Sequence, residues 1–263
     1  MPKEDNYFTQ LKNMAISLKP RKTESNLFCC SKWWGNPDLP PQAEYPMMKI
    51  TEEDGTEGEY PLTFICQIDC EDIAPFDKEG LLPHEGMLYF FAAIDEFIGY
   101  DSPEHFPLGR WPKKAVKVKY AKQINMETFN SCILVDDDDQ ELAEPAMAID
   151  FAECEDDADG FKILGRPYFE EIREEFPDAV NLLQLDEDDD LEMRFYDSGN
   201  FNILISSSDL GFQNWSHAFG FLHSLYFSGG VQRYLPFPNF SRYKNCGKGN
   251  TSELTEAYHK FSE

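Results

Sequence analysis

The chain has 263 residues, of which 41% are hydrophobic and 14% aromatic, and 49 acidic against 23 basic residues give a formal net charge of −26. This is enough apolar material for one large domain or two small ones. No apolar run approaches the roughly 18 to 20 residues that span a bilayer, and the N-terminus lacks the order of a signal peptide. We therefore predict a cytoplasmic protein that binds neither nucleic acid nor membrane.

The negative charge is concentrated in residues 136–197. This segment holds 24 Asp and Glu against 4 Lys and Arg, a net charge of −20. A surface of this kind attracts a basic protein or cations. The alternative is a solvated surface that serves only solubility.

The seven cysteines favour buried free thiols over a disulfide framework. Cys29 and Cys30 are adjacent, and most of the others lie in apolar runs. Cys66 and Cys70 are four residues apart, which is not the CxxC spacing of a redox or zinc site. We expect structural thiols in a reducing compartment.

Hydrophobic periodicity predicts helices near both ends of the folded region and strands between them. Residues 4–19 carry apolar side chains at three- and four-residue steps before Pro20, which indicates an amphipathic helix. A short helix is expected within residues 167–180, and a final helix over about 208–226 from its spaced aromatic residues. Strand-like runs cover residues 61–69, 87–94, 115–121, 181–186 and 200–206.

Two five-residue stretches echo each other. "ICQID" (65–69) and "LLQLD" (182–186) both place apolar residues around a glutamine and end in aspartate. Gly86 and Gly199 then each introduce an apolar strand. The echo predicts two β-rich repeats, about 27–125 and 126–227, in one domain over 1–227. Residues 228–263 are then a C-terminal extension, wrapped around the domain or mobile.

Within each stretch the glutamine and the aspartate share one face of a strand, because side chains alternate. Gln67, Asp69, Gln184 and Asp186 are therefore candidate binding residues in a polar cleft between the repeats. Alternatively, each glutamine bonds neighbouring backbone and each aspartate caps the following turn.

An ordered set of motifs also carries a family resemblance. "SKWWGNPDLP", "PLTFICQIDCEDI", "LLPHEGMLYFF", "KILGRPYFEE" and "NLLQLDEDD" resemble the YwqG-like proteins, a bacterial family of unknown function, over residues 1–227. The resemblance implies an α+β fold with an internal duplication and supplies no catalytic residues. We accordingly predict a β-rich α+β fold with two sheet-containing repeats, an N-terminal helix and a late C-terminal helix.

Two further groups of residues are candidate ligand sites. Trp33 and Trp34 lie in a Gly- and Pro-rich loop and form either an aromatic binding surface or core packing. Asp186, Asp188 and Asp190 have the alternate spacing of a calcium loop, but Leu191 fills the position that needs glycine. A weak Ca²⁺ or Mg²⁺ site there is the alternative to an exposed turn, and we expect no other cofactor.

We find no catalytic motif in the sequence, and the five histidines are scattered. The leading hypothesis is a non-enzymatic acidic module that binds a basic protein, such as an immunity protein that neutralises a toxin in the cell that makes it. The rival is an enzyme or a protein that binds a small ligand or divalent cation in the cleft between the repeats.

Overall fold

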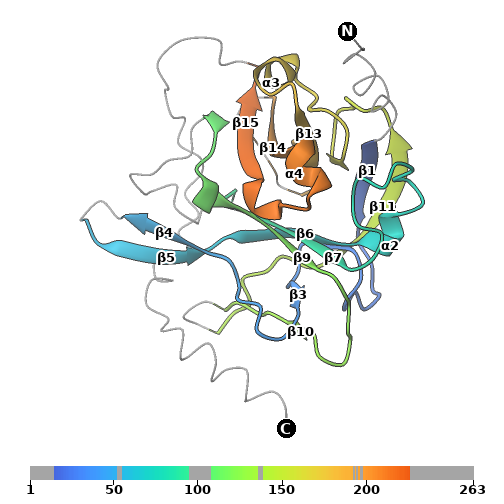
Figure 1. The fold of residues 1–263 in the computed structure, drawn as a ribbon. Coiled ribbons are helices and arrows are strands. Elements are labelled where there is room, and N and C mark those ends of the chain that lie inside the picture. The colour runs from blue at the N-terminus through green and yellow to red at the C-terminus, as the bar shows by residue number, and fades with distance from the viewer. Residues whose placement is uncertain are drawn as a thin grey trace.

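A computed structural model describes residues 15–51, 55–94, 108–135, 139–191, 193, 195 and 198–225. Within these ranges the fold is built on one antiparallel sheet of eleven strands that curls strongly (Figure 1). In spatial order the strands are β8 (Gly109–Arg110), β15 (Phe219–Ser224), β14 (Gly199–Ser206), β13 (Ala179–Leu185), β12 (Lys162–Ile163), β1 (Ala15–Arg21), β11 (Met147–Cys154), β2 (Lys32–Trp33), β6 (Thr63–Asp69), β7 (Met87–Ala92) and β9 (Val116–Ala121).

The remaining described elements are small. Two strand pairs lie outside the large sheet: β4 (Met47–Thr51) with β5 (Glu57–Pro61), and β3 (Asp38–Leu39) with β10 (Asn130–Ser131). The helices are α2 (Cys70–Ile73), α3 (Glu170–Glu175) and α4 (Ser207–Gly211), with 3₁₀ turns η2 (Lys113–Ala115) and η3 (Trp215–His217). The fold is therefore mostly β, and the predicted α+β class is wrong. No helix in the described ranges is long and apolar enough to cross a membrane.

The predicted N-terminal helix is wrong where the structure describes it. Residues 15–21 form strand β1, and residues 4–14 lie outside the described ranges. The apolar spacing of Ala15 and Leu18 fits a buried strand as well as a helix, and long-range pairing with β11 and β12 decides between them. Pro20 is tolerated because β12 pairs only with Ile16 and Ser17, so the missing N–H lies beyond that ladder.

The late C-terminal helix over 208–226 is also wrong. The chain there forms α4, then η3, then strand β15, which pairs with β14 over its whole length. Phe212, expected on the buried side of the helix, is 82% exposed. Helical spacing of aromatic residues in this segment is outweighed by the hydrogen bonds that β14 and β8 offer to β15.

The five predicted strand segments are confirmed as β6, β7, β9, β13 and β14. Their apolar side chains form most of one buried cluster that includes Ile65, Phe90, Leu183 and Ile203. Short apolar runs of this kind are typical of strands buried on both faces. A second, smaller buried cluster joins α3 to β13, β14 and β15 through Ile172, Ala179, Leu204 and Phe221.

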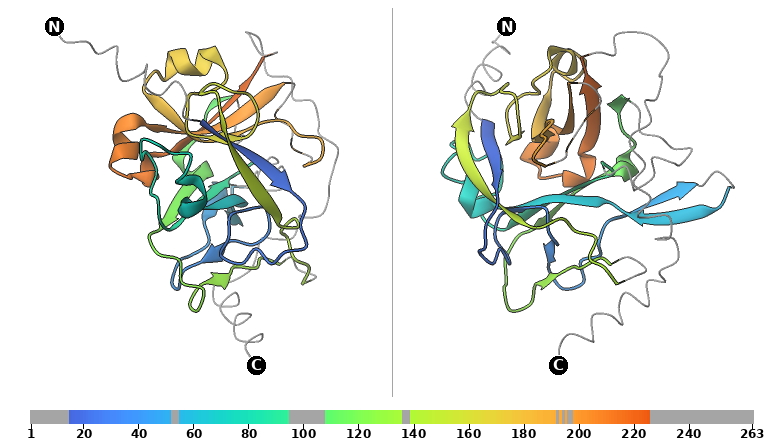
Figure 2. Two further views of the ribbon diagram at one scale, coloured as in Figure 1. Left: turned by 90° about the vertical axis from the view of Figure 1, so that its right-hand side faces the viewer. Right: turned by 180° about the vertical axis from the view of Figure 1, so that it is seen from behind.

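Two strands are exchanged at the centre of the sheet. β1 precedes β2 in the chain, yet it lies beside β12, while β11 precedes β12 and lies beside β2. β1 and β11 pair with each other over seven positions, Ala15 to Arg21 against Cys154 to Ala148. We call β2, β6, β7 and β9 the first half of the sheet and β12, β13, β14 and β15 the second half. The first half is thus bordered by β11, which precedes the second half in the chain, and the second half is bordered by β1, which precedes the first. The β1–β11 pair joins the two halves (Figure 2).

The two ends of the curled sheet are joined by the short segment 111–115. β8 forms one edge of the sheet and β9 the other, although they are nearly consecutive in the chain. Trp111 N donates to Gly220 O at 2.8 Å on one side, and Ala93 N donates to Ala115 O at 2.9 Å on the other. This segment holds the edges of the two halves near each other.

The turns that follow β2 and β12 have the same backbone shape. The motif Lys-x-x-Gly-x-Pro occurs at Lys32 to Pro37 and at Lys162 to Pro167, with positive φ at Trp34 (57°) and Leu164 (61°) and at both glycines. A Cβ on Gly35 would lie 2.7 Å from Ala146 Cβ, and one on Gly165 would lie 2.8 Å from Ala15 Cβ. Gly35 thus lies against the residue that precedes β11, and Gly165 lies against the first residue of β1.

We predict that Gly165→Ala strongly destabilises the protein. Its φ is +69°, and a Cβ would lie 2.3 Å from the backbone oxygen of Asp156. A positive φ alone costs about 1–2 kcal/mol, and the clash adds about 1–3 kcal/mol. The measurement is the free energy of unfolding in urea. Gly80→Ala is the matched control, because its φ is +63° but its nearest neighbour is 3.9 Å away; equal losses for the two variants would contradict the close approach.

Candidate functional site

Gln67 lies fully buried on β6 and holds the turn after β2. Its Oε1 accepts from Asp38 N at 2.8 Å, and its Nε2 donates to Cys30 O at 2.9 Å and to Asp38 Oδ2 at 2.8 Å. The amide thus bonds both ends of the Lys-x-x-Gly-x-Pro turn. It satisfies backbone groups that would be costly to leave unpaired in the interior.

Gln184 does the same in the second half of the sheet. Its Oε1 accepts from Tyr168 N at 3.0 Å, and its Nε2 donates to Gly160 O at 2.9 Å and Ala158 O at 3.2 Å. The two predicted glutamines therefore each clamp a turn of their own half. The structure does not bring them together in a cleft between the halves.

A buried lysine lies opposite each glutamine. Lys32 is paired in register with Gln67, and Lys162 with Gln184. Lys32 Nζ lies 2.7 Å from Asp38 Oδ2, an ion pair that is almost entirely buried. Lys162 Nζ instead donates to the carbonyls of Asp156 and Ala158, and desolvation lowers its pKa to about 8. The halves share the lysine but differ in its partner.

The two predicted aspartates follow their strands as turn residues. Asp69 accepts from Glu71 N at 3.0 Å and so caps α2. Asp186 accepts from Glu187 N at 2.8 Å and from Gly160 N at 2.9 Å. Burial, together with a hydrogen bond to Asp159, raises the pKa of the Asp186 carboxyl to about 7. These contacts match the capping alternative rather than the cleft.

The two tryptophans and Asp188 of the 186–190 turn also make contacts within the fold. Trp33 is fully buried, with its ring 5.0 Å from that of Phe161, and Trp34 is partly buried against the core. Asp188 Oδ1 accepts from Leu191 N at 2.9 Å within its own turn. Across the described residues, no three His, Cys, Asp or Glu form a group that could hold a metal ion, and Asp186, Asp188 and Asp190 form none.

Three acidic segments of the second half meet on the outside of the protein. Arg173 Nη1 of α3 lies 3.9 Å from Asp157 Oδ2 in the β11–β12 loop. Gly160 N of that loop donates to Asp186 at the start of the β13–β14 turn. We name the residues 155–159, 170–178 and 186–190 the acidic surface.

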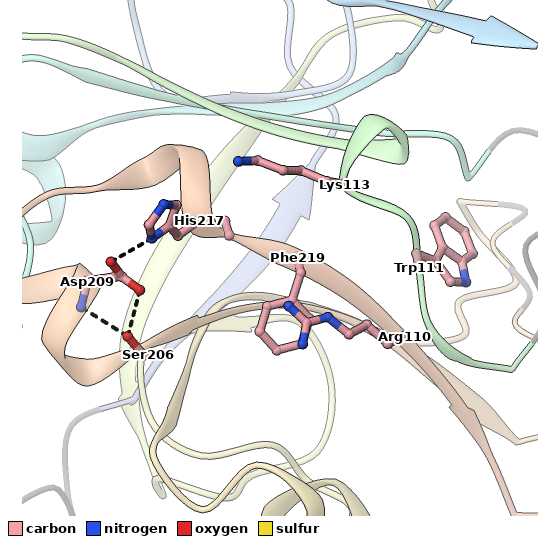
Figure 3. A pocket seen from close by; sticks show the side chains of 8 residues that line it. Arg110, Trp111, Lys113, Ser206, Asp209, His217 and Phe219 are labelled. Atoms are coloured by element: carbon pink, nitrogen blue, oxygen red, sulfur yellow. Dashed lines mark hydrogen bonds and ion pairs between the residues drawn. The ribbon is translucent and has the colours of Figure 1, made fainter.

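A pocket of about 330 Å³ opens where the segment 111–115 joins the two sheet edges (Figure 3). Its walls come from both ends of the sheet: β8, β15 and α4 at one end, and η2, which leads into β9, at the other, with η3 completing the lining. The lining residues are Arg110, Trp111, Lys113, Ser206, Asp209, His217, Ala218 and Phe219.

Asp209 organises the polar end of this pocket. Its Oδ1 lies 2.8 Å from His217 Nδ1 and accepts from Asn214 Nδ2 at 3.0 Å, and its Oδ2 accepts from Ser206 Oγ at 2.9 Å. Hydrogen bonds from Ser206, followed by those from His217 and Asn214, lower the pKa of Asp209. The serine hydroxyl bonds the aspartate and not the histidine, so this is not a Ser–His–Asp triad.

Sequence reasoning missed this pocket. His217 was placed on a long helix that does not exist, and Arg110 and Lys113 carry no motif. The available signal was capping: Ser206 followed three residues later by Asp209 is typical of a helix N-terminus. Nothing local in the sequence indicates that residues 110–113 lie beside residues 206–219.

Comparison with protein families then gives the affiliation of the chain. A family model described as a domain of unknown function (DUF1963) matches residues 31–222. The chain belongs to this family. The match begins beside β2 and ends within β15, so it includes both glutamine clamps and the pocket. Comparison with curated proteins gives no match.

We predict that Asp186→Asn makes stability less dependent on pH. A carboxyl whose pKa is raised from 3.8 to about 7 on folding loses stability as pH rises between these values. An asparagine stays neutral and still accepts a backbone N–H. The free energy of unfolding of the variant minus that of the native chain is measured in urea. This difference should be about 1–2 kcal/mol larger at about pH 8 than at about pH 4, after allowance for solvent screening.

Asp190→Asn is the control for this titration. Asp190 is exposed in the same turn and should show no such difference between the two pH values. A gain for Asp186→Asn that is equal at both pH values would contradict the assignment.

Proposed function

We propose that the protein is a non-enzymatic binding module that engages a basic protein through the acidic surface. The observation that carries the proposal is that five of the exposed carboxylates there have no ion-pair partner within the described residues. Glu155, Glu170, Glu174, Glu175 and Asp190 are exposed and form no ion pair with any residue in the described ranges. Like charges gathered in this way destabilise the folded state through repulsion, so a surface that served only stability would not collect them.

The described basic residues of the acidic segment are used internally. Lys162 is buried against backbone carbonyls. Arg166 Nε pairs with Asp156 at 2.6 Å, and Arg173 donates to the carbonyls of Pro167 and Tyr168. They position the loops and leave Glu170, Glu174 and Glu175 of α3 without an ion pair within the described residues.

A concentrated field of one sign raises the association rate with an oppositely charged partner and excludes like-charged ones. The segment 136–197 carries −20 of the total charge of −26. A basic protein is thus the class of partner that the charge distribution favours. Within this proposal we retain the finer expectations of YwqG-like affiliation, a cytoplasmic location and an immunity-type role against a basic toxin.

The test is capture of a partner followed by measurement of its association rate. The native chain is used as bait at about 50 mM and about 500 mM salt, because screening over a Debye length weakens surface attraction. A basic protein should be recovered at low salt and lost or reduced at high salt. With the purified partner, Glu155, Glu170, Glu174 and Glu175 changed together to Gln should lower the association rate about tenfold or more.

The matched control neutralises four exposed carboxylates of the first half: Glu24, Glu57, Glu59 and Glu79, also to Gln. This control variant changes the net charge by the same amount and should keep most of the native association rate. No partner at either salt concentration, or equal losses in the two variants, would overturn the proposal.

A further inference from the structure

The pocket between the sheet edges has a charge that contrasts with the rest of the molecule. Its lining holds Arg110, Lys113 and His217 against a single carboxylate, Asp209. The chain as a whole carries 49 acidic residues against 23 basic ones. The presence of two cations in one pocket of such an acidic chain therefore calls for an explanation from the surrounding structure.

Arg110 is fixed by stacking and not by a carboxylate. Its guanidinium carbon lies 3.9 Å from the ring centre of Phe219 and 6.0 Å from that of Phe176. Stacking on an aromatic face orients the guanidinium plane and leaves its N–H edge available. No described residue forms an ion pair with it. Figure 3 shows Arg110 lying along Phe219 at one end of the pocket.

Lys113 supplies the second cation, three residues along the chain from Arg110. It lies on η2, is exposed, and has no ion pair within the described residues. The connecting segment 111–115 is bonded to Gly220 and to Ala93, so the backbone that carries Lys113 is fixed. Lys113 thus lies within the segment that joins the two sheet edges, and Arg110 directly precedes that segment.

The one carboxylate of the pocket is already compensated. Asp209 Oδ1 contacts His217 and Asn214, and Oδ2 accepts from Ser206. The same contacts fix the orientation of the His217 ring at the pocket wall. An entering anion would therefore meet Arg110 and Lys113 with little opposition from Asp209.

We propose that this pocket binds a small oxyanion, a carboxylate or phosphate group, through Arg110 and Lys113. The fork of an arginine matches either group with two parallel hydrogen bonds, and a lysine adds a point charge. A volume of about 330 Å³ lies at the small end of the range for ligand pockets. The pocket lining includes no carboxylate of the acidic surface, so the variants that test anion binding differ from those that test protein binding.

The experiment follows the imidazole NMR signals of the full chain during titration with inorganic phosphate and, separately, with acetate. Ionic strength and pH are held constant. The His217 signals should shift and saturate, whereas those of His84, an exposed histidine beside Asp77, should not. The anion that saturates at the lower concentration identifies the preferred group.

Two variants make the test specific. Lys113→Gln and Arg110→Lys should each weaken binding about tenfold, the second because it keeps the charge but loses the fork. Lys22→Gln removes an exposed lysine at the end of β1 and should leave the affinity unchanged. No saturable shift of His217 with either anion, or equal weakening by Lys22→Gln and Lys113→Gln, would overturn the proposal.

Discussion

The structure depends on two buried glutamines, each of which satisfies backbone groups at both ends of a Lys-x-x-Gly-x-Pro turn. Gln67 bonds Cys30 and Asp38, and Gln184 bonds Gly160 and Tyr168, at the same positions of their motifs. A buried amide has no water to replace a lost partner, so the turn and the strand constrain each other. Each turn also packs its glycine closely, Gly35 against Ala146 just before β11 and Gly165 against Ala15 at the start of β1. A local hydrogen-bond pattern thereby fixes how the two halves join.

The halves keep this shared frame and differ in what they add to it. The first half places Asp38 beside its lysine and buries the resulting ion pair. The second half has Tyr168 at that position and surrounds its lysine with an acidic loop whose outer carboxylates face solvent. The acidic surface and the cationic pocket share no carboxylate, although the ring centre of Phe176 at the end of α3 lies 6.0 Å from the guanidinium carbon of Arg110.

The strands and the echo between "ICQID" and "LLQLD" could be predicted because they depend on local alternation and composition. β6, β7, β9, β13 and β14 were found in this way. The two terminal helices were wrong because Ala15–Arg21 and Phe219–Ser224 become strands only through partners far away in the chain. The pocket could not be predicted for the same reason: Arg110 meets residues 206–219 only when the sheet curls. The repeat bounds stay a prediction, and the extension 228–263 lies outside the described residues.

Gln67 and Gln184 hold equivalent turns, one in each half of the sheet, by bonding the backbone on both sides of the turn. Native-state amide hydrogen exchange of Tyr168 and Asp38 tests this equivalence most directly, because these are the amides that the two glutamines accept from. Both should be strongly protected, although the Tyr168 side chain is exposed. In Gln184→Leu the protection of Tyr168 should collapse while that of Asp38 persists. Fast exchange of Tyr168 in the native chain, or equal loss at both amides in the variant, would contradict the account.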